Sequence, residues 1–265
     1  MYVFLNKFLN SKYFNSLPKF FARKIFKMFK IFFVETKLKD LPQNNHPTAV
    51  DENQFEIMKN VEDNFYKPFS TCAYLLELLS LYGSLKDQIR FLDFGANNLD
   101  NYAYLNKYIK NIDYLYHDLP SYNKFIDNFI VKNRLKNIKV INDLSAIKND
   151  LDFVFFGSSI HYVNDYKQIL KKISSSNPKY LLFSHTPFYM SKKNDKDIVM
   201  KQVNIHPTIN YAYFLEYNGF LKFMRENNYT LLSQNKNNFI KFLNFKNLKG
   251  YTFISFLDLL FKKIN

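Results

Sequence analysis

From residue 89 onward, short apolar runs alternate with longer amphipathic segments, and this alternation restricts the chain to a small set of folds. We expect strands at Arg90–Phe94, Ile112–His117, Lys139–Asn142, Leu151–Phe156 and Tyr180–His185. Between them lie segments of helical periodicity at residues 99–110, 123–135 and 164–175. Strand–helix–strand repeats of this kind build a parallel sheet with helices on both faces, so the sequence predicts an α/β domain.

The remaining segments extend this domain in both directions. A long helix is expected over Tyr211–Asn227, followed by strands at Thr230–Ser233 and Tyr251–Phe256. Residues 41–85 are expected to form a polar, proline-containing linker and then helices, with helical periodicity from Phe55 to Leu81. The predicted organisation is a helical extension at 1–40, this linking region at 41–85, and one domain at 86–265.

The first predicted strand ends in a turn that is typical of nucleotide-binding sites. Its sequence over residues 91–98, Phe-Leu-Asp-Phe-Gly-Ala-Asn-Asn, runs from apolar residues through an acid and a glycine toward a predicted helix. Gly95 is one of only five glycines in the chain, and glycine lets the backbone approach a ligand where a Cβ atom would collide. Ligands of parallel sheets bind at the carboxyl ends of the strands, so this turn is a candidate binding site.

Two acids follow the second and third predicted strands at the same edge of the sheet. Asp118 lies 23 residues after Gly95, close to the spacing at which an acid meets ribose hydroxyls in nucleotide-binding units. A carboxylate suits neighbouring hydroxyls because its oxygens accept several hydrogen bonds at once. Asp143 lies where a carboxylate would face an adenine ring. The alternatives are a solvated aspartate at position 118 and, at position 143, a helix N-cap over Leu144–Ile147.

Two of the five histidines are expected at the carboxyl ends of the fourth and fifth strands. His161 comes four residues after Gly157, a second scarce glycine, and we expect the backbone of Gly157 and Ser158 to approach the ligand. Histidine titrates near pH ~6.5, so His161 or His185 is a candidate to take a proton from a hydroxyl at neutral pH. The alternative for each is a hydrogen-bonded structural histidine. No metal site is expected, because no histidine pair or acid cluster has ligand spacing.

Taken together, these motifs resemble a bacterial family of class I S-adenosylmethionine-dependent methyltransferases, whose genes often lie beside surface-polysaccharide genes. The matching segments are, in order, Phe91–Gly95, Ser158–Tyr162, His185–Phe188 and Val203–Pro207, the last followed by Tyr211 and Phe214. The resemblance covers about residues 65–235 and leaves residues 1–50 outside. It implies a Rossmann-like fold with a mostly parallel seven-stranded sheet, in which the final strand is antiparallel.

The resemblance also implies S-adenosylmethionine as the methyl donor. The donor would lie across Gly95, Ala96 and Asn97, with Asp118 on its ribose and Asp93 near its amino-acid part. In the class I motif Asp-x-Gly-x-Gly-x-Gly, Asn97 and Leu99 stand in place of the second and third glycines. The bacterial family commonly has glycines where this chain has Ala96 and Asn97. Asparagine reaches left-handed backbone conformations more easily than most residues, so the change at position 97 is mild.

The activity that the resemblance implies is methylation of a sugar hydroxyl on a surface polysaccharide or its lipid-linked precursor. His161 or His185 would accept the proton of that hydroxyl. Three other classes are weighed against it: a methyltransferase fold that binds without catalysis, a nucleic-acid methyltransferase, and a nicotinamide-dependent dehydrogenase. The second lacks an Asn/Asp-Pro-Pro-Tyr/Phe motif after the fourth strand, and the third lacks the late glycines of its fingerprint, where Leu99 and Asp100 stand.

Residues 1–40 carry nine basic and two acidic side chains, which is half of the net charge of +14. From Pro18 onward, apolar residues recur at helical spacing at positions 21, 25, 28, 29 and 32, while Arg23, Lys24, Lys27 and Lys30 lie largely on other faces. A basic amphipathic helix is typical of an element that lies on an anionic membrane surface. The alternative is a helix that packs its phenylalanines on the main domain and leaves its lysines solvated.

The positive charge favours anionic partners, but the composition predicts no specific nucleic-acid partner. A lone cysteine, Cys72, excludes an intramolecular disulfide and fits a reducing compartment. The longest clean apolar run near the start, Ile31–Val34, is far shorter than the ~20 residues that span a bilayer. We therefore expect a cytoplasmic protein that is peripheral at the inner membrane face if its basic helix docks there.

Overall fold

The structure of the chain is a computed structural model that describes residues 2–36, 75, 79, 88–147, 151–191, 196–203, 210–236, 245, 248, 251 and 253–264. The linker expected at 41–53 lies outside these residues. So does most of the helical stretch expected from Phe55 to Leu81, of which Leu75 and Leu79 are described, both helical and buried.

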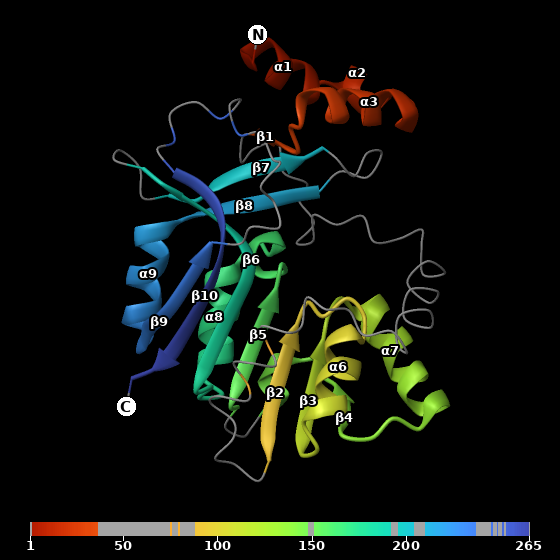
Figure 1. Cartoon of the computed structure of the whole chain (residues 1–265), viewed down its shortest axis with the longest axis vertical. Helices are drawn as coiled ribbons and strands as arrows, with labels where there is room; N and C mark the ends of the chain where they lie inside the picture. Colours follow the sequence, from red (N-terminus) through yellow and green to blue (C-terminus); the bar gives the residue numbers. More distant parts are fainter. Residues whose placement is uncertain are drawn as a thin grey trace.

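Seven strands form the sheet that the sequence predicts. They are β2 (Ile89–Phe94), β3 (Ile112–His117), β4 (Ile138–Val140), β5 (Phe153–Gly157), β6 (Tyr180–Met190), β9 (Tyr229–Lys236) and β10 (Phe253–Lys263). Their order across the sheet is β4-β3-β2-β5-β6-β10-β9. The strands from β4 to β6 in this order are parallel to one another, and β10 is antiparallel to both β6 and β9 (Figure 1). The mostly parallel sheet with an antiparallel final strand is thereby confirmed.

Alternating side chains of each strand build a separate core on each face of the sheet. Leu92 and Phe94 of β2 pack in one cluster with residues of α8 (Tyr166–Ser174) and α9 (Tyr217–Glu226). Phe91 of the same strand packs in the other, with residues of α6 (Asp100–Tyr108) and α7 (Pro120–Asn133). Helices therefore cover both faces, and α6, α7 and α8 confirm the three helices expected between the strands.

Three further strands extend the sheet beyond the end of β5. The second half of β6 pairs in parallel with β8 (Asn210–Glu216), β8 pairs antiparallel with β7 (Ile198–Gln202), and β7 pairs antiparallel with β1 (Phe33–Glu35). In Figure 1 these strands lie across the end of the molecule toward which β2 and β5 point. The extension thus borders the edge of the sheet where the candidate site residues were expected.

The helix expected over Tyr211–Asn227 is wrong in its first half, which forms β8. In the strand, Ala212 and Phe214 pack into an apolar cluster while Tyr211 and Tyr213 stay half-buried on the other side. A run of apolar and aromatic residues this short is compatible with both the 3.6-residue period of a helix and the two-residue period of a strand. The available edges of β6 and β7 decide the outcome by supplying hydrogen-bond partners to the backbone.

The N-terminal segment contains α1 (Tyr2–Leu9), α2 (Lys12–Asn15) and α3 (Lys19–Phe29). The helical spacing expected to reach Phe32 breaks after Phe29, because Lys30 adopts a left-handed conformation with φ of 51° and the chain then enters β1. The three helices share an apolar cluster with β1 and Val203. No helix that the structure describes has the length and apolar content needed to cross a membrane.

Candidate functional site

The turn after β2 requires glycine at position 95. Gly95 has φ of +67°, and its backbone N–H donates to the carbonyl of His117 at 2.8 Å, which joins the ends of β2 and β3. A Cβ atom at this position would lie 2.3 Å from the Cβ of Ser159, which follows β5. Such a distance is far inside van der Waals contact, so the ends of three strands approach each other only because the residue is glycine.

Asn97 takes the left-handed conformation that the family's glycine would take, with φ of 58°. Its backbone N–H donates to Oδ2 of Asp118 at 2.6 Å, and its carbonyl accepts from the hydroxyl of Tyr116 at 3.1 Å. Leu99, in place of the third glycine, is almost completely buried in the core beneath the turn. The sequence departures at 97 and 99 are therefore both accommodated without closing the space above the turn.

Asp118 lies immediately after β3 and faces this turn. Besides the bond from Asn97, its Oδ1 accepts from the backbone N–H of Leu119 at 2.6 Å. Its own backbone N–H donates to Oδ1 of Asn123 on α7 at 2.9 Å. These two backbone donors fix the orientation of the carboxylate at the edge of the turn, where its oxygens can accept further hydrogen bonds.

A cavity of about 510 Å³ opens where β2, β3 and β5 end. Its volume lies within the range of roughly 300–1,000 Å³ that is usual for small-molecule sites. It is lined by Phe94, Gly95, Asn97, His117, Asp118, Leu119, Pro120, Tyr122, Asn142, Ser158, Ser159, Tyr162, Val163 and Ile169. Four of the predicted site residues, Gly95, Asn97, Asp118 and Ser158, thus come together at one cavity.

Asp93, Ala96 and Gly157 do not line this cavity. Asp93 is buried below the turn, where its Oδ2 accepts from the hydroxyl of Tyr114 and from the side-chain amide of Asn101. Burial raises the pKa of the Asp93 carboxyl to about 6. Ala96 packs in the core, and Gly157 is half-buried at the end of β5. These three residues support the turn and strand end rather than border the open space.

Asp143 caps a helix, as the alternative interpretation of this residue proposed. Its side chain accepts from the backbone N–H of Ser145 at 3.0 Å at the start of a short 3₁₀ helix, η3 (Leu144–Ala146). The Lys172 ammonium, which donates to Oδ1 at 2.7 Å, holds the pKa of this exposed carboxyl below its usual range. The residue that lines the cavity here is its neighbour Asn142.

His117 lines the cavity but was missed by the sequence analysis. Its Nδ1 lies 2.6 Å from the carbonyl of Ile141, so Nδ1 donates the hydrogen bond and Nε2 is left as an acceptor. The ring packs on that of Phe94 at 5.2 Å between centroids. Burial lowers the pKa of His117, so the ring is neutral at pH 7. Its position directly before Asp118 was the available signal.

The two histidines predicted as proton acceptors are close neighbours in the structure but differ in exposure. His161, in the 3₁₀ helix η4 (Ile160–Tyr162), is completely buried, and neither ring nitrogen has a hydrogen-bond partner among the described residues. Burial, with a smaller contribution from His185, lowers the pKa of His161 to about 3. His185 is partly exposed. Neither histidine lines the cavity, although Tyr162 beside His161 does.

The backbone places His185 beside the cavity wall. The backbone N–H of Ser158, which lines the cavity, donates to the carbonyl of Ser184 at 2.9 Å. His185 is the next residue after Ser184. His185 has φ of 52°, and its N–H donates to Oδ1 of Asp258 at 2.8 Å. Here β6 leaves β5 and continues toward β8. His185 therefore lies at the branch point between the cavity and the extension.

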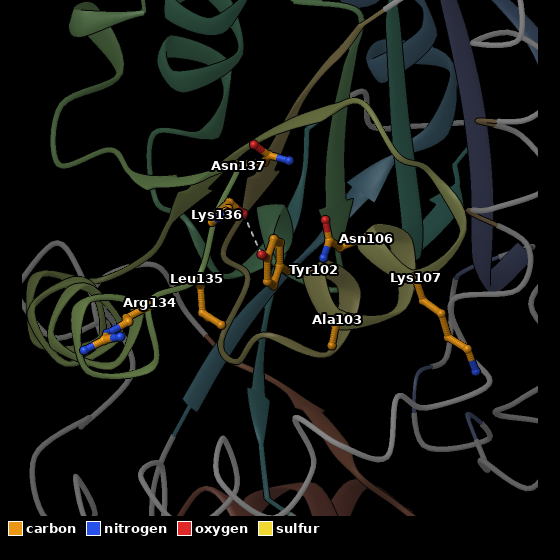
Figure 2. Close-up of a pocket in the computed structure, with 8 residues that line it drawn as sticks. All are labelled: Tyr102, Ala103, Asn106, Lys107, Arg134, Leu135, Lys136 and Asn137. Atoms are coloured by element: carbon orange, nitrogen blue, oxygen red, sulfur yellow. Dashed lines mark hydrogen bonds between the residues drawn. The ribbon is translucent and has the colours of Figure 1, made fainter.

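A second hollow, of about 530 Å³, lies at the opposite edge of the sheet, before β3 and β4 begin (Figure 2). Its floor includes Tyr102, whose hydroxyl donates to the carbonyl of Lys136 at 2.6 Å. Lys107 and Arg134 point away from each other in this view, so they do not converge on one ligand. No carboxylate lines this hollow among the described residues, and parallel sheets bind ligands at the other edge.

No group of three or more histidine, cysteine, aspartate or glutamate side chains that could hold a metal ion occurs in the described part of the chain. The expectation that the protein needs no metal stays a prediction.

No protein-family model matches the sequence, and neither does any curated protein. Solved structures do match. The N-terminal domain of EvdMO1 with SAH bound has a TM-score of 0.52 and 10% identity, over 95% of this chain and 99% of that one. A SAM-dependent methyltransferase from Clostridium acetobutylicum has a TM-score of 0.51 and 12% identity, over 80% of this chain and 100% of that one. The [4+2]-cyclase SpnF has a TM-score of 0.51 and 8% identity, over 94% and 96%.

At these identities the likeness concerns the fold. Together with the strand order and the antiparallel β10, it establishes that this chain has the Rossmann-like fold of class I S-adenosylmethionine-dependent methyltransferases.

Proposed function

We propose that this protein is a methyltransferase with S-adenosylmethionine as its methyl donor. One observation carries the proposal: the cavity above the first two strand ends brings Gly95, Asn97 and Asp118 together. In this fold, a ligand at that edge lies beside the switch in strand order, which falls between β2 and β5. SAH, the demethylated form of the donor, is bound in the EvdMO1 domain, which shares the fold.

The residues present fit the donor. Asp118, oriented by two backbone donors and lining the cavity, is the residue proposed to accept hydrogen bonds from the ribose hydroxyls. Gly95 lets the backbone of the turn come close to the donor, since a side chain there would already collide with Ser159. Apolar side chains from Leu119, Val163 and Ile169 line the cavity and suit a flat adenine ring. Asp93, Ala96 and Gly157 are proposed to act through the shape of the surrounding backbone.

When bound, the donor's sulfonium supplies an activated methyl group, which needs no metal for transfer. The chain contributes the alignment of the acceptor and the removal of its proton. His185 is the residue proposed to accept that proton, because it directly follows Ser184, whose carbonyl accepts from the backbone N–H of the cavity-lining Ser158. His161 is neutral and enclosed, so its proposed role is to hold the strand ends around His185.

The proposed acceptor is a hydroxyl on a sugar or on a surface-polysaccharide precursor. This assignment rests on the resemblance of residues 158–162 and 185–188 to the bacterial family described above. Lipid-linked precursors of this kind are found at the cytoplasmic face of the inner membrane, and the basic N-terminal segment suits that location. A cytoplasmic protein that is peripheral at this membrane is therefore part of the proposal.

Calorimetry with S-adenosylmethionine and S-adenosylhomocysteine tests the donor site directly. We expect micromolar binding by the wild type and a loss of roughly tenfold to hundredfold in Asp118→Ala, because two hydroxyls lose a charged acceptor. Asp143→Ala is the matched control: it removes an acid outside the cavity, and binding should not change. Folded wild-type protein that binds neither ligand at millimolar concentration would refute the donor assignment.

The second candidate is a protein of this fold that binds a glycan without methylating it. Two observations favour it: Asn97 and Leu99 replace two glycines of the usual motif, and a cyclase, SpnF, shares the fold. Transfer of a radioactive methyl group to sugar acceptors separates the two candidates. Donor binding without transfer to any sugar or polysaccharide precursor, together with glycan binding, would favour the second.

A further inference from the structure

We propose that the exposed face of α3 docks this protein on an anionic lipid surface. The face consists of Phe20, Phe21 and Met28 together with the basic residues Arg23, Lys24 and Lys27. The inference specifies the membrane partner of the proposed function, but lipid binding by this face does not depend on methyl transfer.

The apolar part of this face lacks cover. Phe20, Phe21 and Met28 are 62%, 55% and 68% exposed, whereas large apolar side chains are normally buried in a soluble domain. Nine large apolar side chains are exposed among the described residues, and five of them belong to the N-terminal helices. This concentration in one short segment marks an interaction surface.

Helical geometry separates this face from the packed one. Phe20, Lys24 and Met28 follow each other at four-residue spacing and therefore share one side of the helix. Ala22 and Phe26 form the buried side, and the ring of Phe26 packs edge-on against Phe14 of α2. Phe26 and the half-buried Phe29 pack on the N-terminal cluster, whereas Phe20 and Phe21 are exposed, so α3 packs only part of its phenylalanines on the protein.

The charge of the segment selects an anionic partner. Residues 2–34 contain seven basic side chains and no acidic one. Lys24 lies over the ring of Phe20, with Nζ 4.5 Å from the ring centroid, so charge and aromatic surface are interleaved on the same face. Aromatic side chains at the headgroup boundary with lysines beside anionic headgroups are typical of interfacial helices.

The helices are fixed to the sheet, so docking would orient the whole protein. Lys201 of β7 is buried, and its Nζ donates to the carbonyl of Leu9 at 3.0 Å and to Oδ1 of Asn15 at 2.7 Å. Figure 1 shows the three helices beyond β1, β7 and β8, at the end toward which β2 and β5 point. The helices that would meet the membrane therefore lie beyond the extension that follows the strand ends bordering the cavity.

Flotation with lipid vesicles tests the proposal. We expect the wild type to float with vesicles of phosphatidylcholine and phosphatidylglycerol but not with phosphatidylcholine alone, and to be released by high salt. Lys24→Ala with Lys27→Ala should lower the partition coefficient roughly 25-fold, or roughly fivefold for each lysine lost. Phe20→Ser with Phe21→Ser and Met28→Ser should also abolish flotation.

The matched control is Val131→Ser with Lys132→Ala on α7, which removes an exposed apolar residue beside a lysine on another helix and should leave flotation unchanged. The chain contains no tryptophan, so Phe20→Trp introduces a single reporter. Its emission should shift to shorter wavelength with vesicles that contain phosphatidylglycerol, because the ring enters the headgroup boundary.

Several results would overturn the inference. The first is wild-type protein that stays unbound to both kinds of vesicle, and the second is flotation that the α3 substitutions do not reduce. The third is a wild-type dimer that the triple serine variant dissociates, without vesicle binding, which would make a second copy the partner. The fourth is lysine-dependent binding of duplex DNA with no tryptophan shift on vesicles, which would make nucleic acid the partner.

Binding of S-adenosylhomocysteine by the α3 variants keeps this test separate from the proposed function. Unchanged calorimetry in the variants shows that they are folded with an intact donor site, so a loss of flotation reports on α3 alone. If the wild type floats but binds no donor, the docking surface stands and the methyltransferase assignment falls.

Discussion

The carboxylate of Asp118 accepts a hydrogen bond from the backbone N–H of Asn97 at 2.6 Å, which links the loop after β3 to the turn after β2. Because Asn97 holds φ of 58°, its N–H points at the carboxylate and its carbonyl at the hydroxyl of Tyr116. The two residues that the sequence marks as donor-binding are thus parts of one hydrogen-bonded unit. Changes to the turn should therefore affect the orientation of Asp118.

Gly95→Ala should destabilise the protein by about 2–4 kcal/mol, since the new Cβ atom collides with Ser159 and the backbone is held at positive φ. Ser159→Gly in the same chain removes the atom that is hit and should recover part of this loss. Urea unfolding of the two single variants and the double variant measures the coupling. Strictly additive losses would contradict the close approach of the two strand ends.

The stability of the protein should fall as Asp93 ionises. The pKa of Asp93 in the folded protein is about 6, because burial disfavours the charge, whereas an exposed aspartate titrates near pH ~3.9. A raised pKa means that the folded state binds the proton more tightly. The contribution of this group is therefore complete below pH ~4 and is lost as the pH rises through about 6, by about 3 kcal/mol in total.

Asp93→Asn cannot titrate, so the difference in unfolding free energy between it and the wild type should change by this amount between about pH 4 and pH 7.5. Urea titrations at a series of pH values provide the measurement. Asp165→Asn, a substitution at an exposed aspartate whose side chain makes no capping hydrogen bond, is the matched control. A difference that does not vary with pH for Asp93→Asn would show that its carboxyl has an ordinary pKa.

Asp258→Ala should loosen the branch point of β6. Oδ1 of Asp258 accepts from the backbone N–H of His185 at 2.8 Å and from the hydroxyl of Ser184 at 2.9 Å. Hydrogen bonds to charged groups contribute about 1.5–3 kcal/mol each, so we expect a loss of about 2–4 kcal/mol on thermal or urea unfolding. Asp258→Asn keeps an acceptor oxygen and should lose less. Equal losses in both variants would show that the charge, rather than the acceptor geometry, holds His185.

The same pair of variants reports on the proposed proton acceptor. If His185 takes the acceptor's proton, Asp258→Ala should lower the rate of methyl transfer more than it lowers donor affinity, because the donor cavity does not include either residue. Calorimetry with S-adenosylhomocysteine supplies the affinity and labelled methyl transfer the rate. If Asp258→Ala lowers donor affinity and the methyl-transfer rate by the same factor, the substitution disturbs the fold of the whole site rather than proton transfer by His185.

The sequence determined the central sheet of this protein. Strands of parallel sheets buried on both faces are short apolar runs, and the runs that end at Phe94 and His117 are bounded by a glycine and an acid that stop them. Gly95 and Asp118 were predictable as partners because strand order in such repeats brings successive carboxyl ends to one edge, whereas Asn97 was assigned to the site by the family resemblance. The local pattern carries this information, because it follows from backbone geometry and apolar spacing alone.

The tertiary structure decided what the local pattern leaves open. Tyr211 and its neighbours form a strand because β6 and β7 offer free edges, and Asn142 rather than Asp143 reaches the cavity because Asp143 caps η3 and binds Lys172. His161 and His185 are equivalent as strand-end histidines in sequence, yet one is enclosed and the other is partly exposed. Burial depends on packing between distant segments, and only the assembled fold determines which side chain of a strand end meets solvent or a ligand.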